Sequence, residues 1–305
     1  MKINSKPSVS VIIPVYNGSA FVDEAIQSIL DQTYKKLELV IVNDGSTDET
    51  LAILKRFKDL HPRKIKVISY VQNLGESAAA NIGFAASRGE FIARMDADDI
   101  SYPDRISKQV TFMTANPGVV VVGSQADVIS EKGEIIGKKT FPQYHPSIYR
   151  DYGFYHPMMH PSCMFRCKLL PYKNRLWENS HEPNDDYYTL FGLLRFGKFA
   201  NLPESLIAYR LHGNNKSLQN ARKKVFSAMR VRKDAILNFG YRPGALAVML
   251  NLAQLIGALI LPERLIVPAY LLMRGMNSPT GVLNRILTQF RRVYSLTYVS
   301  RKQVV

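Results

Sequence analysis

The chain has 305 residues, 46% of them hydrophobic, and a formal net charge of +15. This length and apolar content exclude an intrinsically disordered chain and suit one large domain with an appendage, or two modest domains. The C-x3-C spacing of Cys163 and Cys167 matches no common zinc motif, so we expect two reduced thiols. Residues 1–7 contain no apolar signal-peptide core, so we expect the chain to start and stay in the cytoplasm.

The first 100 residues alternate short β-branched runs with helical patterns. The βαβαβαβ order predicts an α/β fold with a doubly wound, mostly parallel sheet. Ligands of such sheets bind beyond the carboxyl ends of the strands, where "PVYN", "NDGS" and "DADD" all fall. Continuous apolar runs predict buried strands, and helical spacing predicts helices, in this order: strand 9–15, helix 19–32, strand 37–44, helix 47–59, strand 64–70, helix 76–87 and strand 90–96.

The pattern changes after residue 100. We place a loose domain boundary near residue 215, so that residues 1–215 form the main domain, with halves of about 8–124 and 125–215, and residues 216–305 form a helical tail. Within the main domain we expect a helix at 103–115, short strands near 119–123 and 126–129, a polar turn at 131–139, a strand at 162–166 and a helix around 185–195.

Nearly all the excess positive charge lies in the tail. Residues 216–305 hold 15 Lys and Arg residues against two acidic residues, a balance of +13. The apolar run 245–261 is at the lower length limit for a spanning helix, and the run 265–273 is too short and contains Pro268. We expect shallow insertion in the membrane plane; the alternative is a helical pair that covers the flank of the main domain, and both can hold together. Insertion would place near lipid headgroups Arg242, Arg264, Arg274, Arg291 and Arg292.

Three aspartates cluster at the expected strand end 90–96. Asp96 and Asp98 share a face if the chain is extended, and their hard oxygen atoms suit Mg²⁺ or Mn²⁺ together with substrate phosphates. Helix capping does not explain the cluster, because Ser101 and Asp104 already supply a cap for the next helix. An EF-hand loop is excluded, because its sixth position would be Ser101 instead of Gly. The motif therefore predicts a site for a metal ion and a diphosphate.

These motifs, in this order, resemble one known family. The segments "VSVIIPVYNGSAFVDEAIQSILDQTYKKLELVIVNDGSTDET" and "NLGESAAANIGFAASRGEFIARMDADD" look like the nucleotide-sugar half of family 2 glycosyltransferases, which are inverting enzymes of GT-A fold. The resemblance covers roughly residues 8–215. It implies a nucleotide-sugar donor, with a UDP-sugar as the first expectation, and Mn²⁺ or Mg²⁺ as cofactor.

The resemblance implies roles for residues after the first two strands. Pro14 and Tyr16 would flank the base, with Tyr16 stacking on it and Asn17 nearby. Asp44 would accept a hydrogen bond from the ring N–H of the base. The same residues also suit a tight turn and an Asx-turn before a helix, and these structural roles are compatible with binding.

The resemblance also assigns the aspartates. Asp96 would contact the ribose or the metal ion, Asp98 would be the main metal ligand, and Asp99 is a further candidate.

The third loop departs from the family pattern. Asn73 and Asn81 match the Asn-rich helix start, but the Arg that usually precedes the second Asn is Ala80 here. Arg94 could substitute for this Arg, or it could simply pair with one of the aspartates.

The second half would supply the general base. "NDDYYTLFGLLRFGKFANLPESLIAYRLHGNNKS" is similar to the family's acidic pair at a helix start, which implies that Asp186 deprotonates the acceptor and that Asp185 replaces the usual Glu. Both acids also suit the first turn of any helix. His212 and Arg210 are candidates for the metal ion or the diphosphate, and His160 is a further candidate, although a lone His is more often structural.

The sequence thus predicts a metal-dependent inverting glycosyltransferase. The basic, apolar tail favours a saccharide or lipid-linked saccharide acceptor in cell-surface polysaccharide synthesis, with peripheral association at the inner face of the cell membrane. One alternative is a nucleotide-sugar-binding or membrane scaffold protein without turnover. A nucleic-acid partner is not expected, because the basic residues of the tail are interleaved with aliphatic runs and not with aromatic stacking positions.

Overall fold

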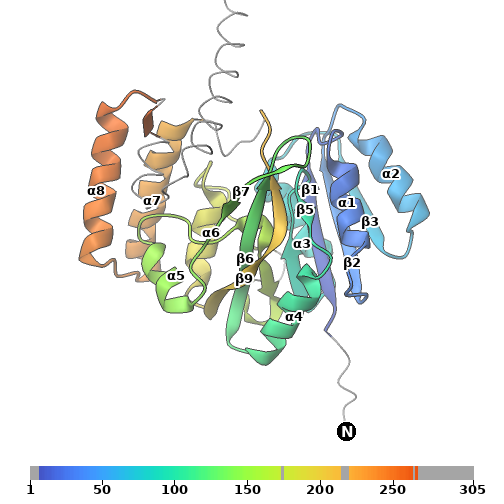
Figure 1. Cartoon of the computed structure of the whole chain (residues 1–305), viewed down its shortest axis with the longest axis horizontal. Helices are drawn as coiled ribbons and strands as arrows, with labels where there is room; N and C mark the ends of the chain where they lie inside the picture. The colour runs from blue at the N-terminus through green and yellow to red at the C-terminus, as the bar shows by residue number, and fades with distance from the viewer. Residues whose placement is uncertain (1–6, 173–174, 214–219, 264, 267–305) are drawn as a thin grey trace, which may run out of the picture.

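The computed structural model describes residues 7–172, 175–213, 220–263 and 265–266. Within these residues one nine-stranded sheet has the order β3-β2-β1-β4-β8-β6-β9-β5, and β7 pairs with β6 (Figure 1). The strands are β1 (Val9–Val15), β2 (Leu37–Asp44), β3 (Ile65–Tyr70), β4 (Phe91–Arg94), β5 (Ile100–Ser101), β6 (Val119–Ile129), β7 (Ile135–Lys139), β8 (Met164–Arg166) and β9 (Lys198–Arg210). The α-helices are α1 (Val22–Leu30), α2 (Thr50–Leu60), α3 (Glu76–Ala86), α4 (Arg105–Ala115), α5 (His145–Asp151), α6 (Asp185–Leu193), α7 (Ala221–Phe239) and α8 (Ala245–Ile260).

The first half of the sheet is parallel, as predicted. β3, β2, β1 and β4 lie side by side, with Val15 opposite Asn43 and Ile12 opposite Arg94. Alternate β1 residues belong to different apolar cores: Val11 and Ile13 pack on one face of the sheet, and Ile12 packs on the other. This two-sided burial explains the continuous apolar runs, and it aligns the carboxyl ends of β1, β2 and β4 at one edge.

The second half of the sheet is mixed. β8 lies between β4 and β6 and is antiparallel to both, and β9 is parallel to β6. The two short strands predicted near 119–123 and 126–129 are one continuous strand, β6, which absorbs register shifts against β9 around Ser124 and Gln125. The prediction of a turn over all of 131–139 is wrong, because Gly133 at φ 85° closes a hairpin and β7 follows.

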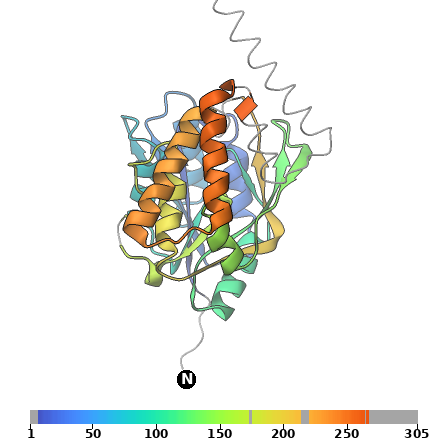
Figure 2. The same cartoon turned by 90° about the vertical axis from the view of Figure 1, so that its left-hand side faces the viewer.

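The helices α7 and α8 lie side by side against the end of the fold that is formed by α5 and α6 (Figures 1 and 2). Val231 and Ala235 of α7 belong to the same apolar core as Phe191 of α6. Among the described residues, no helix is long and apolar enough to cross a membrane. The predicted boundary near residue 215 stays a prediction. Most of the second apolar run, together with Arg264, Arg274, Arg291 and Arg292, lies outside the described residues.

Candidate active site

Three loops meet where β1, β2 and β4 end. Tyr16 and Asn17 follow β1, Asp44 ends β2, and Asp96 follows β4. The parallel register of these strands places the loops next to one another, because β1 pairs with both β2 and β4. The convergence that the sequence predicted at this edge is therefore what the topology produces.

The aspartates Asp96, Asp98 and Asp99 form one cluster. Each offers a carboxylate oxygen, and these oxygens lie within 4.8 Å of one another. Asp99 is buried, and its Oδ1 accepts a hydrogen bond from the Arg210 backbone N–H (3.0 Å), whereas its Oδ2 is buried and has no hydrogen-bond partner among the described residues. Burial, followed by the charges of Asp96 and Asp98, raises the pKa of Asp99 well above its usual value. A buried oxygen with no partner beside two other carboxylates is the arrangement that a divalent cation would satisfy.

Two residues from the end of β9 hold this cluster. His212 Nε2 lies 2.8 Å from Asp98 Oδ2, so the imidazole contacts the predicted metal ligand. The Arg210 guanidinium donates to the Asp98 carbonyl oxygen (2.9 Å) and pairs with Glu24 of α1 (2.6 Å). Arg210 therefore fastens the aspartate loop to β9 and α1. A role for Arg210 towards the diphosphate, and for His212 as a metal ligand, stays a prediction.

Arg94 pairs with an aspartate of the cluster, which was one of the two roles considered. Its guanidinium lies 2.8 Å from Asp96 Oδ1 and 2.9 Å from Glu76 Oε1, and its side chain is only 1% exposed. Burial raises the pKa of Asp96 to about 7 with help from Glu76, Asp98 and Asp186, although Arg94 opposes the rise. Since the Asp96 side chain remains 30% exposed, water moderates this shift.

The loops after β1 and β2 are tied to each other. Asn17 has φ 49°, its N–H donates to Ser46 Oγ (2.9 Å), and its Oδ1 accepts from Thr47 N (2.8 Å). Pro14 is buried within β1, whereas Tyr16 is 51% exposed at the site edge. The ring of Tyr16 is thus open to solvent beside the two hydrogen-bonded loops, which suits the predicted stacking on a base.

Asp44 organises the loop that leads into α3. Its two carboxylate oxygens accept from the N–H groups of Leu74 (2.8 Å) and Gly75 (2.9 Å), and the side chain is buried. Each oxygen keeps a second lone pair, so a further hydrogen bond from a base remains a prediction. Asn73 is exposed in the same loop, and its Oδ1 also accepts from Gly75 N (3.1 Å).

Asn81 is engaged within the protein. Its Oδ1 accepts from the N–H groups of Leu176 and Trp177 (both 2.8 Å), and its Nδ2 donates to the Trp177 carbonyl oxygen (2.7 Å). The adjacent Ala80 is buried in an apolar core. In the structure Asn81 therefore clamps the segment before α6 onto α3, and contact with the nucleotide stays a prediction.

The acidic pair begins α6, as predicted. Asp185 Oδ1 accepts from His181 N (2.8 Å), and its Oδ2 accepts from Ser77 Oγ of α3 (3.3 Å), so this residue joins the two halves. Asp186 accepts from Tyr187 N through Oδ1 (2.8 Å), while its side chain is 38% exposed. Asp185 is a structural link, and Asp186 is the acid that presents an accessible carboxylate.

Sequence reasoning missed two residues near Asp186. His156, in the loop after α5, places Nε2 3.6 Å from Asp186 Oδ2. Lys224 of α7 is close enough for the charge of Asp186 to counter, in part, the burial that lowers the lysine pKa to about 8. The stretch 141–160 stood out for its His and aromatic residues, but no spacing rule selects His156 within it, and Lys224 comes from the predicted tail.

His160 is half-buried and packs against Trp177 of the apolar core. Its Nε2 accepts from Trp177 Nε1 (2.9 Å), and both side chains are held among aromatic rings. Burial, followed by the positive charges of Arg94 and His156, places the pKa of His160 well below its usual value. His160 is therefore a neutral hydrogen-bond acceptor in this structure, which is the structural role that a lone His most often has.

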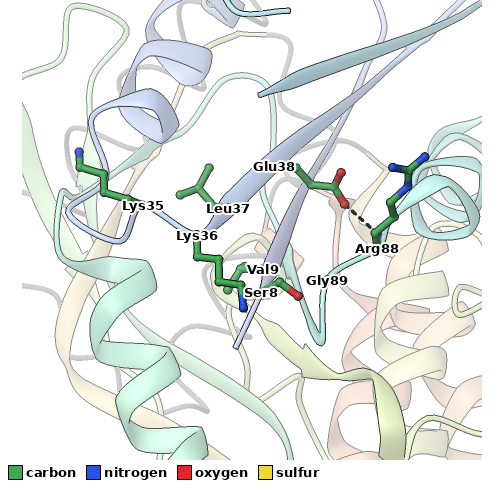
Figure 3. A pocket seen from close by; sticks show the side chains of 8 residues that line it. All are labelled: Ser8, Val9, Lys35, Lys36, Leu37, Glu38, Arg88 and Gly89. Carbon is green, nitrogen blue, oxygen red and sulfur yellow. Dashed lines mark hydrogen bonds between the residues drawn. The ribbon is translucent and has the colours of Figure 1, made fainter. Parts of the chain in front are cut away.

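A cavity of about 320 Å³ lies at the opposite end of the strands. Its lining comes from the starts of β1 and β2 and from the turn before β4 (Figure 3). Glu38 accepts from Arg88 N (2.7 Å) there. Since the aspartate cluster follows the carboxyl ends of the same strands, this cavity is separate from the site above.

Comparison with known proteins decides the class. The model of the family described as "Glycosyl transferase family 2" matches residues 10–171, just over half of the chain. This chain belongs to glycosyl transferase family 2. An uncharacterized glycosyltransferase of Haemophilus influenzae is 34% identical over 258 residues, which are 82% of this chain and 80% of the relative. The O-antigen biosynthesis glycosyltransferase WbnJ of Escherichia coli is 33% identical over 224 residues, 72% of this chain and 85% of that protein.

Solved structures confirm the predicted GT-A fold for this family 2 glycosyltransferase. S. aureus TarS in complex with UDP-GlcNAc aligns with a TM-score of 0.63 at 19% identity, over 82% of this chain and 72% of that one. The mannosyltransferase PcManGT from Pyrobaculum calidifontis, in complex with GDP-Man and Mn²⁺, aligns with a TM-score of 0.61 at 17% identity, over 98% and 84%. At these identities the likeness shows the fold alone.

Proposed function

We propose that this glycosyltransferase is metal-dependent and inverting, and that it moves a sugar from a UDP-sugar to a saccharide or lipid-linked saccharide in cell-surface polysaccharide synthesis. The observation that carries metal dependence is the buried Asp99 Oδ2 within the cluster of three aspartates, which no group of the described part of the chain hydrogen-bonds. WbnJ, named for O-antigen biosynthesis, supports the acceptor class, and the UDP-GlcNAc complex of TarS supports a UDP-sugar.

The residues would divide the work between the two halves of the sheet. Asp98, with Asp96 and Asp99 beside it, would hold Mn²⁺ or Mg²⁺, which neutralises charge on the departing nucleoside diphosphate. Asp186 would take the proton of the acceptor hydroxyl as that oxygen attacks the anomeric carbon. The link from Asp185 to Ser77 fixes the base-bearing helix against the donor half, so the two groups keep a defined separation.

The test uses donors and two acidic variants. A panel of UDP-, GDP- and dTDP-sugars is incubated with acceptors and with Mn²⁺, Mg²⁺ or EDTA. We expect turnover of one donor by the wild type, and losses on the order of 10²- to 10⁴-fold in Asp98→Ala and Asp186→Asn. Asp104→Asn, just beyond the cluster and exposed, is the matched control that keeps activity. NMR of the product should show inversion at the anomeric carbon.

Two results would contradict the proposal. Turnover by the wild type in EDTA at the rate seen with Mn²⁺ or Mg²⁺ would exclude metal dependence. Donor binding that survives in Asp186→Asn, while the wild type gives no product even with lipid-linked acceptors, would favour the binding-protein alternative.

Membrane association is the second part of the proposal, and α8 supports it. The helix turns its polar side chains inward: Asn251 and Gln254 both accept from the buried Arg232 guanidinium of α7. Its outward face contains only apolar side chains that are between 43% and 73% exposed: Leu246, Val248, Met249, Leu252, Ile256, Leu259 and Ile260. A soluble surface helix has the opposite arrangement, so this face requires an apolar partner.

An anionic lipid surface fits this helix best. The tail carries +13 of the net charge, and its exposed cations include Arg230 and Lys233 on the neighbouring helix α7 and Arg242, which precedes α8. Apolar side chains in the acyl boundary with cations at headgroup level are the pattern of in-plane membrane helices. A lipid-linked acceptor would be reached from the inner face of the cell membrane.

The lipid test has a matched control. The wild type should co-sediment with vesicles that contain phosphatidylglycerol, and the double variant Met249→Glu/Leu252→Glu should not. Leu60→Glu, at an equally exposed leucine on α2 at the far side of the molecule (Figure 1), should bind as the wild type does. Wild-type dimerisation that the same double variant abolishes, without lipid binding, would assign the face to a second copy instead.

A further inference from the structure

The predicted base, Asp186, is faced by an imidazole. His156 Nε2 lies 3.6 Å from Asp186 Oδ2, beyond hydrogen-bond length but within ion-pair range. His156 comes from the loop after α5, whereas Asp186 lies in the first turn of α6, so only the fold brings them together. Contacts of this length in a free enzyme often shorten in the substrate complex.

The other ring nitrogen of His156 identifies the tautomer. Nδ1 accepts a hydrogen bond from Met158 N (3.3 Å), so in the neutral ring the proton is on Nε2, directed towards Asp186. A histidine that acted as the base, with Asp186 orienting it, would need a free nitrogen for the acceptor. Because Nδ1 is occupied and Nε2 carries the proton, this geometry makes His156 a donor and leaves Asp186 as the base.

Aromatic packing fixes the direction of the ring. His156 lies 5.8 Å from the Tyr152 ring and 5.3 Å from the Tyr187 ring, measured between centroids. These two tyrosine rings stack on each other, and the Tyr187 hydroxyl donates to the Tyr152 carbonyl oxygen. The imidazole is therefore held in a rigid aromatic cluster next to the carboxylate, which is what a positioning role requires.

We propose that His156 is a positioning residue for Asp186, and this inference rests on the proposed function. Its Nε2–H stabilises the carboxylate form of Asp186 and fixes the orientation of that carboxylate. As the acceptor oxygen bonds to the anomeric carbon, its proton passes to Asp186, and the nucleoside diphosphate leaves with the electron pair of the broken C–O bond. His156 keeps its own proton throughout.

Other groups around Asp186 act in both directions. The ammonium of Lys224 on α7 favours the carboxylate form, and the acids Asp185 and Asp96 disfavour it. Burial keeps the Tyr152 hydroxyl and the Cys163 thiol uncharged by raising the pKa of each. The Tyr187 N–H already donates to Asp186 Oδ1, and the N–H of His156 adds a favourable contact at Oδ2.

The kinetic test replaces the imidazole by an aromatic ring that has no N–H hydrogen-bond donor. His156→Phe should lower kcat about tenfold, equivalent to about 1.4 kcal/mol, with the donor KM unchanged. The acid limb of the kcat profile should move to higher pH, because the base loses a contact that favours its charged form. His156→Gln, which retains an N–H donor, should recover most of the rate. His145→Phe is the matched control, since His145 Nδ1 also accepts a backbone N–H, from Phe199 (3.1 Å), but belongs to α5.

Two further measurements show whether His156 acts through Asp186. Adding His156→Phe to Asp186→Asn should cause no further loss of the residual rate. Independently of turnover, ¹⁵N NMR should show His156 protonated on Nε2, with a resonance that moves in Asp186→Asn while that of His145 does not.

Four outcomes separate the possibilities. An unchanged kcat profile in His156→Phe, or an equal loss in the Asp186→Asn background, overturns the positioning role. A neutral ring protonated on Nδ1 overturns it even where His156→Phe fails to fold. Absence of wild-type turnover with every donor sinks the proposed function instead, and the NMR result then decides whether the contact exists.

Discussion

Replacement of Asn81 by Ala tests whether this residue serves the fold or the nucleotide. The side chain makes three hydrogen bonds to the backbone of Leu176 and Trp177, at 2.7 to 2.8 Å. Alanine would leave two N–H groups and one carbonyl oxygen in a partly buried place without a partner. At about 1 kcal/mol for each bond, the free energy of unfolding should fall by about 3 kcal/mol.

The assay is urea unfolding followed by fluorescence of Trp177, the only tryptophan, whose own backbone is released by the substitution. We expect a lower midpoint with an unchanged slope, and unchanged donor affinity under conditions where the variant is folded. Gln125→Ala is the matched control, because Gln125 also clamps backbone, at Phe141 and Leu202 (2.5 and 2.9 Å), but on β6. An unfolding midpoint equal to that of the wild type, together with a tenfold lower affinity for the nucleotide-sugar, would refute the structural role and indicate that Asn81 contacts the nucleotide.

Three other predictions follow from single contacts. Gly45 has φ 74°, so Gly45→Ala should destabilise the protein by about 1–2 kcal/mol from the left-handed backbone alone. The total should be larger, because the new Cβ would lie 2.8 Å from Asn73 N. An unchanged urea midpoint would contradict this. In the metal-free protein, the raised pKa of Asp96 means that the native state binds more protons than the unfolded state between about pH 4 and 7. The free energy of unfolding should therefore fall as pH rises from about 4 to 7. Urea unfolding in EDTA should show a smaller fall in Asp96→Asn than in the wild type, and replacement of EDTA by Mn²⁺ should reduce the fall in the wild type. An identical pH slope of the two proteins in EDTA would argue against this. Arg232→Met should leave the side-chain oxygens of Asn251 and Gln254 without their donor and the Phe154 carbonyl oxygen with Gln254 Nε2 alone, at a cost of about 3 kcal/mol. Limited proteolysis should then cut near α8 sooner, and resistance equal to that of the wild type would count against this anchoring.

The sequence predicted the donor half well because its signals are local. β1 and β2 are continuous β-branched runs that form strands in any parallel sheet with two covered faces, and the structure has both at the expected residues. The second half was harder, since its strands pair across long separations. β7 follows a polar turn and was not expected, and β6 was expected in two pieces, because its pairing with β9 tolerates register shifts that no local pattern reveals.

Sequence alone determined which residues gather at the carboxyl edge of the sheet, because strand order and parallel direction follow from β-branched runs that alternate with helical patterns. It also determined the family, through motifs carried on those loops. Only the tertiary structure decided which side chains are already engaged: Asn81 with the backbone of 176–177, Arg94 with Asp96, and His156, not His160, with Asp186. The physical reason is that hydrogen-bond and ion-pair partners are set within a few ångströms by packing between distant segments, and a sequence pattern has no access to that distance.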